Sequence, residues 1–336
     1  MPAVSFIIPA YNAEKYLSDA LDSIRQQTFN DWELIVVNDA STDSTAEIIN
    51  RYTDLDFRIR SIHRKENSGS CRLPRFDGVL SAQGDYICSI DSDDWIEGEY
   101  VEKMICRARE TGADIVCGKM VMSSSSGHLL GRAIPSTDED LYATLSPLDA
   151  CKRTIGEWKI ALAGMFVKRE IYQKYVREFY NVGKSLFYSI ELDQRRLLLS
   201  SALIVMQKAD YFYRQHDESI VHQVTLKSYD ILTSKRDFVE WVNNVFGNGK
   251  ELQIVIHEYL EDLYRAHCRY VENFFTYTER ERYLIRKSLK KSYSFVKLYN
   301  LINTSLKEKL MLNNSMSLFF CAILQVLYVR IKKIYA

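Results

Sequence analysis

The chain has 336 residues, and its 44 Lys and Arg balance its 44 Asp and Glu, so it has no formal net charge at pH 7. This balance argues against a protein that binds nucleic acid through a broad positive potential, and the length allows one large domain with an appendage. The seven cysteines are scattered without a Cys-x-x-Cys pair or a Cys/His cluster, which argues against a disulfide framework and a structural zinc site.

The first elements read as alternating strands and helices. Residues 4–8 form an apolar, β-rich run that ends at Pro9, and residues 14–27 place apolar side chains at helical spacing. A second apolar run, residues 33–37, is followed by Asp39 and by a Ser/Thr-rich stretch that favours the start of a helix. Continuously apolar strands that alternate with helices predict a mainly parallel sheet covered by helices on both faces.

A third apolar run, residues 85–90, leads into three carboxylates within four residues. Asp91, Asp93 and Asp94 repel one another unless a cation neutralises them, and a hard divalent ion that also binds phosphate oxygens fits that need. The alternative is a solvated acidic turn, or a cap for a helix that begins at Trp95. Ligands of parallel sheets bind beyond the carboxyl ends of the strands, so these carboxylates should converge with the residues that follow the first two strands.

Four segments in this order and spacing resemble glycosyltransferase family 2. They are residues 4–12, 37–43, 67–78 and 84–94, and the resemblance extends over about residues 1–220. It implies the GT-A fold, an α/β architecture with a Rossmann-like, mixed, mainly parallel sheet flanked by helices. It also implies the inverting transfer of a sugar from a nucleotide-diphosphate sugar.

The resemblance further implies roles in binding the nucleotide sugar. Asp39 resembles the aspartate that accepts a hydrogen bond from the nucleobase, while its alternative role is to cap the next helix. Pro9 and Tyr11 resemble the turn that packs against the base. Asp91 and Ser92 resemble part of the Asp-x-Asp element of the family, which implies that Asp91 is nearer the ribose.

The cationic and metal-binding positions follow from the same segments. Asp93, together with Asp91, is implied as a ligand of Mn²⁺ or Mg²⁺. Arg75 matches an arginine near the diphosphate, where a guanidinium makes charge-assisted bonds. The chain departs from the family pattern here, because one extra residue follows Gly69 and Phe76 replaces an Asn. Arg72 is therefore a competing phosphate contact.

The catalytic base is expected on a later helix. An inverting transfer needs a base for the acceptor hydroxyl, and residues 188–197 resemble the helix on which the family carries an acidic pair. Counting back from the motif at residues 211–220 puts Glu191 at the base position and Ile190 beside it. Three alternatives stay open: Asp193 is the base after a small register shift, activity is impaired, or the acidic residues are an ordinary first helical turn.

Two further side chains follow the last predicted strand of this region. Arg214 and His216 are placed to meet the diphosphate or the metal, so Arg214 is a candidate nucleotide-sugar ligand and His216 a candidate metal ligand. The alternative for His216 is a packing or surface role.

The sequence divides into a catalytic domain, residues 1–225, and a helical region, residues 226–336. The nucleotide-sugar half of the catalytic domain covers about residues 1–122, and the acceptor half about residues 128–225. The helical region ends in an apolar run, residues 316–329, that is too short to cross a bilayer and is followed by basic residues. We expect this terminal segment to lie on an anionic membrane, with docking on the helical region as the alternative.

The function expected from these features is an inverting glycosyltransferase of bacterial capsule, O-antigen or exopolysaccharide synthesis. Its acceptor would be a hydroxyl of a glycan or lipid-linked molecule. We expect no signal peptide and a cytoplasmic location. This location includes a peripheral position on the cytoplasmic face of the inner membrane. One alternative is a nucleotide-sugar-binding protein impaired by Ile190. The other is a nucleotidyltransferase, against which the absence of glycine from residues 9–15 counts.

Overall fold

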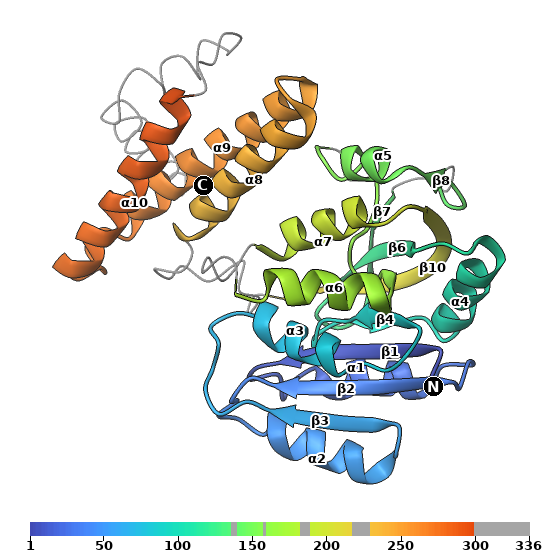
Figure 1. Cartoon of the computed structure of the whole chain (residues 1–336). Coiled ribbons are helices and arrows are strands. Elements are labelled where there is room, and N and C mark those ends of the chain that lie inside the picture. Colours follow the sequence, from blue (N-terminus) through green and yellow to red (C-terminus); the bar gives the residue numbers. More distant parts are fainter. Residues whose placement is uncertain (136–139, 157–158, 182–188, 217–228, 299–336) are drawn as a thin grey trace. The chain divides into compact units, whose positions relative to one another are not determined.

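The computed structural model describes residues 1–135, 140–156, 159–181, 189–216 and 229–298 (Figure 1). Among these, the side chains of residues 189–191, 293 and 296–298 are not described. The chain forms two compact units, Met1–Ser219 and Ile220–Ala336. The predicted boundary between residues 225 and 226 lies outside the described residues, as does the predicted membrane-binding segment.

The first unit is a mixed α/β domain. Its elements are β1 (Val4–Ala10), α1 (Leu17–Arg25), β2 (Trp32–Asn38), α2 (Thr45–Leu55), β3 (Ile59–His63), α3 (Arg72–Ser81), β4 (Tyr86–Ser89), β5 (Trp95–Ile96), α4 (Tyr100–Thr111), β6 (Ile115–Ser124), β7 (Leu129–Ile134), β8 (Thr144–Leu145), α5 (Pro147–Lys152), β9 (Phe166–Lys168), α6 (Arg169–Phe179), α7 (Ser189–Ser200) and β10 (Ile204–Gln215).

These strands form one sheet in the order β3-β2-β1-β4-β9-β6-β10-β5, with β7 beside β6 and β8 beside β10. The pairs β1–β2, β1–β4, β2–β3 and β6–β10 are parallel, whereas β9 is antiparallel to both β4 and β6. The predicted fold class, a mixed and mainly parallel sheet flanked by helices, is confirmed. Because β4, β6 and β10 share one direction, their carboxyl ends reach the same edge as those of β1 and β2.

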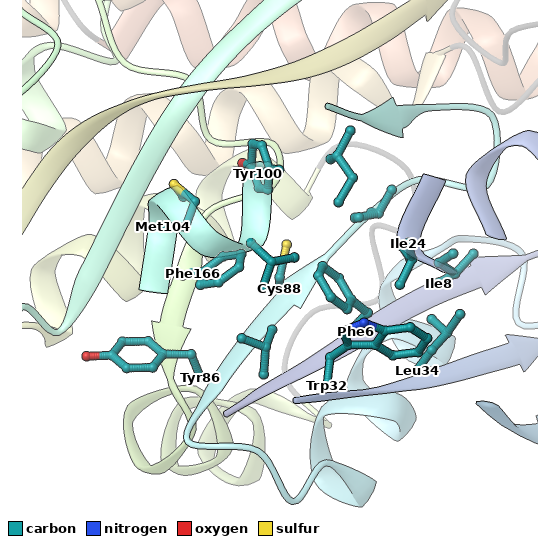
Figure 2. Close-up of a cluster of buried hydrophobic side chains, with 14 of the residues drawn as sticks. Phe6, Ile8, Ile24, Trp32, Leu34, Tyr86, Cys88, Tyr100, Met104 and Phe166 are labelled. Carbon is teal, nitrogen blue, oxygen red and sulfur yellow. The ribbon is translucent and has the colours of Figure 1, made fainter. Parts of the chain in front are cut away.

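Alternate residues of the central strands fill two cores. Phe6 and Ile8 belong to a buried cluster that also contains Ile24 of α1 and Met104 of α4 (Figure 2). Phe166 of β9 joins this cluster, with its ring centroid 6.3 Å from that of Phe6. Burial of this kind stabilises a fold by about 1.5–3 kcal/mol for each large apolar side chain.

Helix α3 packs on the opposite face of the sheet. Gly78 lies against Ile7, and a Cβ atom at this position would clash with Cγ2 of Ile7 and lie 3.3 Å from Cγ2 of Val37. The glycine therefore permits a close approach of helix and strand. It lies one turn after Arg75, so this packing fixes the helix that carries a candidate diphosphate ligand.

Some predicted boundaries were wrong. The helix predicted over residues 14–27 is the shorter α1, and the helix alternative at Trp95 fails because residues 95–96 form β5 against β10. Pro9 lies inside β1, paired with Val37. The ladder between β1 and β4 ends at Ile7, so the missing N–H of Pro9 removes no bond to β4.

The second unit contains three helices in its described part: α8 (Ile231–Phe246), α9 (Lys250–Glu272) and α10 (Glu279–Leu298). Each has an apolar side that is buried within the unit, with Val239, Tyr259 and Ile285 as examples. In the part of the chain that the structure describes, no helix is both long and apolar enough to cross a bilayer.

Candidate active site

The carboxyl ends of β1, β2, β4 and β10 bring most of the predicted site residues to one edge of the sheet. Ala10 at the end of β1 pairs with Asn38 at the end of β2, and the backbone N–H of Asp39 donates to the carbonyl of Ala10 at 2.9 Å. Tyr11 follows β1 and is 50% exposed, so its ring is open to a ligand.

Asp39 is buried and binds the loop before α3. Its carboxylate accepts hydrogen bonds from the backbone N–H of Ser68, at 3.0 Å, and from Ser68 Oγ, at 2.7 Å. The guanidinium of Arg64 lies 2.9 Å from the same carboxylate. The capping alternative was wrong, since the Asp43 carboxylate accepts from the N–H of Thr45 at the start of α2. A role of Asp39 toward a nucleobase stays a prediction.

In the acidic loop after β4, residues 91–94, each of the three carboxylates has a different partner. Asp91 accepts a hydrogen bond from Arg75 at 2.6 Å, and Asp93 lies 2.9 Å from Nε2 of His216. Asp94 is fully buried and accepts from Tyr211 Oη at 2.5 Å and from the backbone N–H of Arg214 at 2.9 Å. Burial raises the pKa of Asp94 well above its usual value, and the charges of Asp93 and Asp91 raise it further.

This loop fits a divalent ion that shares its ligand shell with a diphosphate. The side chains of Asp91 and Asp93 are 45% and 33% exposed, so carboxylate oxygens are accessible, and mutual repulsion between carboxylates favours a nearby cation. Within the described ranges, no three His, Cys, Asp or Glu side chains form a group that could hold a metal ion. One or two carboxylates with phosphate oxygens and water are the usual shell of Mg²⁺. The metal role of Asp91, Asp93 and His216 stays a prediction.

The two arginines of α3 have different partners. Arg75 is 94% buried at its side chain and reaches the acidic loop through Asp91. Arg72 instead donates from Nε to Asp193 at 2.6 Å and from a terminal nitrogen to the carbonyl of Phe179 at 3.0 Å. Arg72 is thus occupied by α6 and α7, and Arg75 is the arginine beside the acidic loop.

The predicted base candidates lie on α7. Asp193 is buried, and besides the Arg72 pair it accepts a hydrogen bond from Tyr175 Oη at 2.5 Å. Burial and the Asp193 charge raise the pKa of Tyr175, so this phenol stays a donor. Glu191 lies in the first turn of α7, and its side chain is outside the described residues. Both assignments stay predictions, but the carboxylate of Asp193 is already engaged by two protein donors.

Arg214 is held by protein groups on all sides. Its Nε donates to the backbone carbonyl of Asp93 at 2.7 Å, and its terminal nitrogens donate to the carbonyl of Ser125 at 2.9 Å and to Asp19 at 2.8 Å. The guanidinium carbon lies 4.5 Å from the ring centroids of both Tyr16 and Trp95. The side chain predicted to bind the diphosphate therefore ties β10 to α1 and to the acidic loop.

Sequence reasoning missed three residues of this arrangement: Tyr16, Asp19 and Tyr211. Asp19 and Arg214 are 195 positions apart, and no local pattern links them. Tyr16 lies beside His216, with ring centroids 5.0 Å apart. A usable signal was present only for Tyr211, which precedes Arg214 in the motif at residues 211–220.

Comparison with known proteins identifies the family. The family model described as Glycosyl transferase family 2 matches residues 5–176, which cover the whole acidic loop and α3. The chain belongs to glycosyltransferase family 2. The predicted family is confirmed. The matched segment ends before α7, so it excludes Glu191 and Asp193.

Among the relatives of this family 2 chain is Glycosyltransferase GlyA of Streptococcus pneumoniae, 35% identical over 216 residues that cover 63% of this chain and 30% of GlyA. Glycosyltransferase GlyG of the same species is 27% identical over 253 residues, 70% of this chain and 77% of GlyG. The crystal structure of S. aureus TarS 1–349 in complex with UDP-GlcNAc has a TM-score of 0.60 at 20% identity and covers 88% of this chain and 82% of that chain. The similarity to TarS establishes the shared fold.

Proposed function

We propose that the protein is an inverting glycosyltransferase that transfers a sugar from a nucleotide-diphosphate sugar to a hydroxyl of a glycan or lipid-linked acceptor. The observation that carries this proposal is the convergence of Asp39, Arg75 and the acidic loop on one sheet edge, in a chain of family 2. Two similar structures of S. aureus TarS 1–349 are complexes, one with UDP-GlcNAc and one with UDP, which supports a uridine nucleotide as the donor to test first.

Different residues of this edge would bind the base, the diphosphate and the cation of the donor. Tyr11 offers an exposed ring for a base, and Asp39 offers a carboxylate whose position is fixed by Ser68 and Arg64. Arg75 brings a permanent positive charge next to Asp91, where a diphosphate and its cation would meet. Asp93 and Asp91 would hold Mn²⁺ or Mg²⁺. A bound divalent ion supplies positive charge for the departing diphosphate.

The acceptor step needs a general base that deprotonates the attacking hydroxyl. We assign this role to Glu191, because Asp193 already accepts from Arg72 and Tyr175. We further propose that the enzyme acts in bacterial capsule, O-antigen or exopolysaccharide synthesis. For the wider architecture we propose that residues 1–225 are catalytic and that the segment 312–336 contacts the cytoplasmic face of the membrane.

The test of the donor site is binding of UDP with and without Mn²⁺, measured by calorimetry, followed by incubation with a panel of UDP-sugars. We expect UDP affinity to rise with Mn²⁺ and this rise to disappear in Asp93→Asn, while the melting temperature stays close to that of the wild type. Undiminished metal-dependent affinity in Asp93→Asn would overturn the metal assignment. Metal-dependent UDP binding without turnover of any donor, with or without acceptor glycans, would favour the impaired nucleotide-sugar-binding protein instead.

A further inference from the structure

Helix α10 has two chemically different sides. Its buried side contains Ile285, Leu289 and Phe295, and the Phe295 ring packs against Tyr259 of α9 with centroids 5.6 Å apart. Figure 1 shows α10 next to α9, in orange and red. This side therefore anchors α10 within the helical unit and determines which side of the helix remains open to solvent.

The open side of α10 is strongly basic. Among the side chains of α10 that the structure describes, the exposed cations are Arg280, Arg286, Lys287, Lys290 and Lys291. From residue 282 to residue 298 the sequence contains no Asp or Glu, so no acidic side chain of this part of the helix offsets the last four of these cations. Arg280 differs, because it lies between Glu279 and Glu281 in the first turn. Like charges at helical spacings of three and four residues repel one another, and an anionic partner would relieve that repulsion.

Two apolar side chains lie on the same open side. Tyr283 is 64% exposed and Leu284 is 44% exposed, and both fall between the cations along the helix. Tyrosine prefers the boundary between water and lipid, and a basic helix with exposed apolar side chains is typical of segments that lie in the plane of a membrane. At 1.5 Å per residue, the basic strip from Arg280 to Lys291 is about 17 Å long.

We propose that the open side of α10 binds the headgroups of an anionic lipid bilayer. The five cations supply attraction to the charged surface, while Tyr283 and Leu284 enter the headgroup layer. Because the whole chain has no net charge, this attraction must be local to the strip. The residues of this site belong neither to the donor-binding edge nor to the terminal segment 312–336.

The experiment is co-sedimentation of the full-length protein with phosphatidylcholine vesicles that contain or lack phosphatidylglycerol, at low and high salt. Each cation near an anionic surface contributes about 1 kcal/mol, roughly a fivefold change in partitioning. The triple variant Lys287→Gln, Lys290→Gln and Lys291→Gln should therefore bind anionic vesicles about a hundredfold more weakly. The variant Tyr283→Ser should show a smaller loss, which persists at high salt.

Two control variants remove three positive charges each, the same change in net charge as in the α10 triple variant. The exposed residues Arg132, Lys152 and Lys174 of the first unit, all changed to Gln, should leave vesicle binding unchanged. A second triple variant changes Arg330, Lys332 and Lys333 to Gln in the full chain, and reports on the terminal segment. UDP affinity is measured in every variant, so that a fault in the donor site is recognised separately.

The proposal is overturned if the α10 triple variant binds like the wild type, or if only the terminal variant loses binding. Equal binding to vesicles without phosphatidylglycerol would overturn it as well, as would binding to soluble polyphosphate without binding to vesicles. If the triple variant does not fold, Arg280→Gln with Arg286→Gln replaces it, with an expected loss of about 25-fold from the same contribution per cation.

Discussion

The Nε atom of Arg214 donates a hydrogen bond to the backbone carbonyl of Asp93, 121 positions earlier in the chain, at 2.7 Å. Through this bond the last strand of the sheet holds the loop that carries the candidate metal ligands. The other donors of Arg214 reach α1 through Asp19 and the turn after β6 through Ser125. The guanidinium of Arg214 thus links β10, the acidic loop, α1 and the turn after β6. Its N–H donors have a fixed planar arrangement, which suits it to bind several partners at once.

The first prediction concerns Arg214→Lys. The lysine ammonium group keeps the positive charge, but it lacks the planar set of N–H donors and cannot stack between Tyr16 and Trp95. We therefore expect the free energy of unfolding to fall by about 1–3 kcal/mol. Because the Asp93 carbonyl is released, metal-dependent UDP affinity should fall too. Arg132→Lys, at an exposed position of β7, is the control and should change stability by less than about 0.5 kcal/mol. Equal stability and UDP affinity in both variants would contradict the role of Arg214.

The second prediction separates the two base candidates. Asp193→Asn leaves the buried guanidinium of Arg72 without its carboxylate, and we expect a loss of about 3–5 kcal/mol in urea unfolding. Glu191→Gln should leave stability and UDP affinity unchanged and lower the transfer rate by about two to four orders of magnitude.

The companion variant Arg72→Met with Asp193→Leu removes both charges and should recover part of the lost stability. A stable Asp193→Asn protein that binds UDP but transfers no sugar, beside an active Glu191→Gln protein, would identify Asp193 as the base instead.

The sequence predicted that the candidate site residues converge on one edge of the sheet, because the determining features are local. The apolar runs of β1 and β2 are continuous, Tyr11 and Asp39 follow directly after a strand, and Asp91 lies two positions after the end of β4. In a parallel sheet those ends meet at one edge, so strand order was not needed to bring the residues together.

The strands and side-chain pairs that the sequence did not predict depend on contacts between distant segments. Strand β9 has three residues and β5 has two, too few for a periodic pattern, although β9 joins β4 to β6 in the centre of the sheet. The Arg72–Asp193 pair spans 121 positions, and nothing near either residue indicates the other. The protein partners of Arg214 on α1, the acidic loop and the turn after β6 were likewise not predictable from the sequence near Arg214. Its role toward a diphosphate stays a prediction.

The third prediction concerns Gly78→Ala in α3. Alanine favours a helix by about 1 kcal/mol, but its Cβ would clash with Ile7, and overpacking of a core costs about 1–3 kcal/mol. We expect a net loss of thermal stability and, because α3 must move with Arg75, weaker UDP binding. Gly98→Ala is the control, since a Cβ there meets no atom within 4 Å. A Gly78→Ala protein that is more stable than Gly98→Ala would show that α3 is not held against the sheet in this way.

The fourth prediction is a pH dependence of the helical unit that arises from His267 on α9. This side chain is buried beside the carbonyl of Leu263, and burial lowers its pKa below the usual value. Below neutral pH the unfolded chain therefore binds more protons at this position than the folded chain, so the free energy of unfolding should fall as the pH drops below about 6.5. In His267→Gln, which can still donate to Leu263, this part of the pH dependence should vanish. Hydrogen exchange of the α9 amides at pH 5, 6 and 7 measures it locally, with the exposed His257→Gln as control, and an unchanged pH profile in His267→Gln would contradict the prediction.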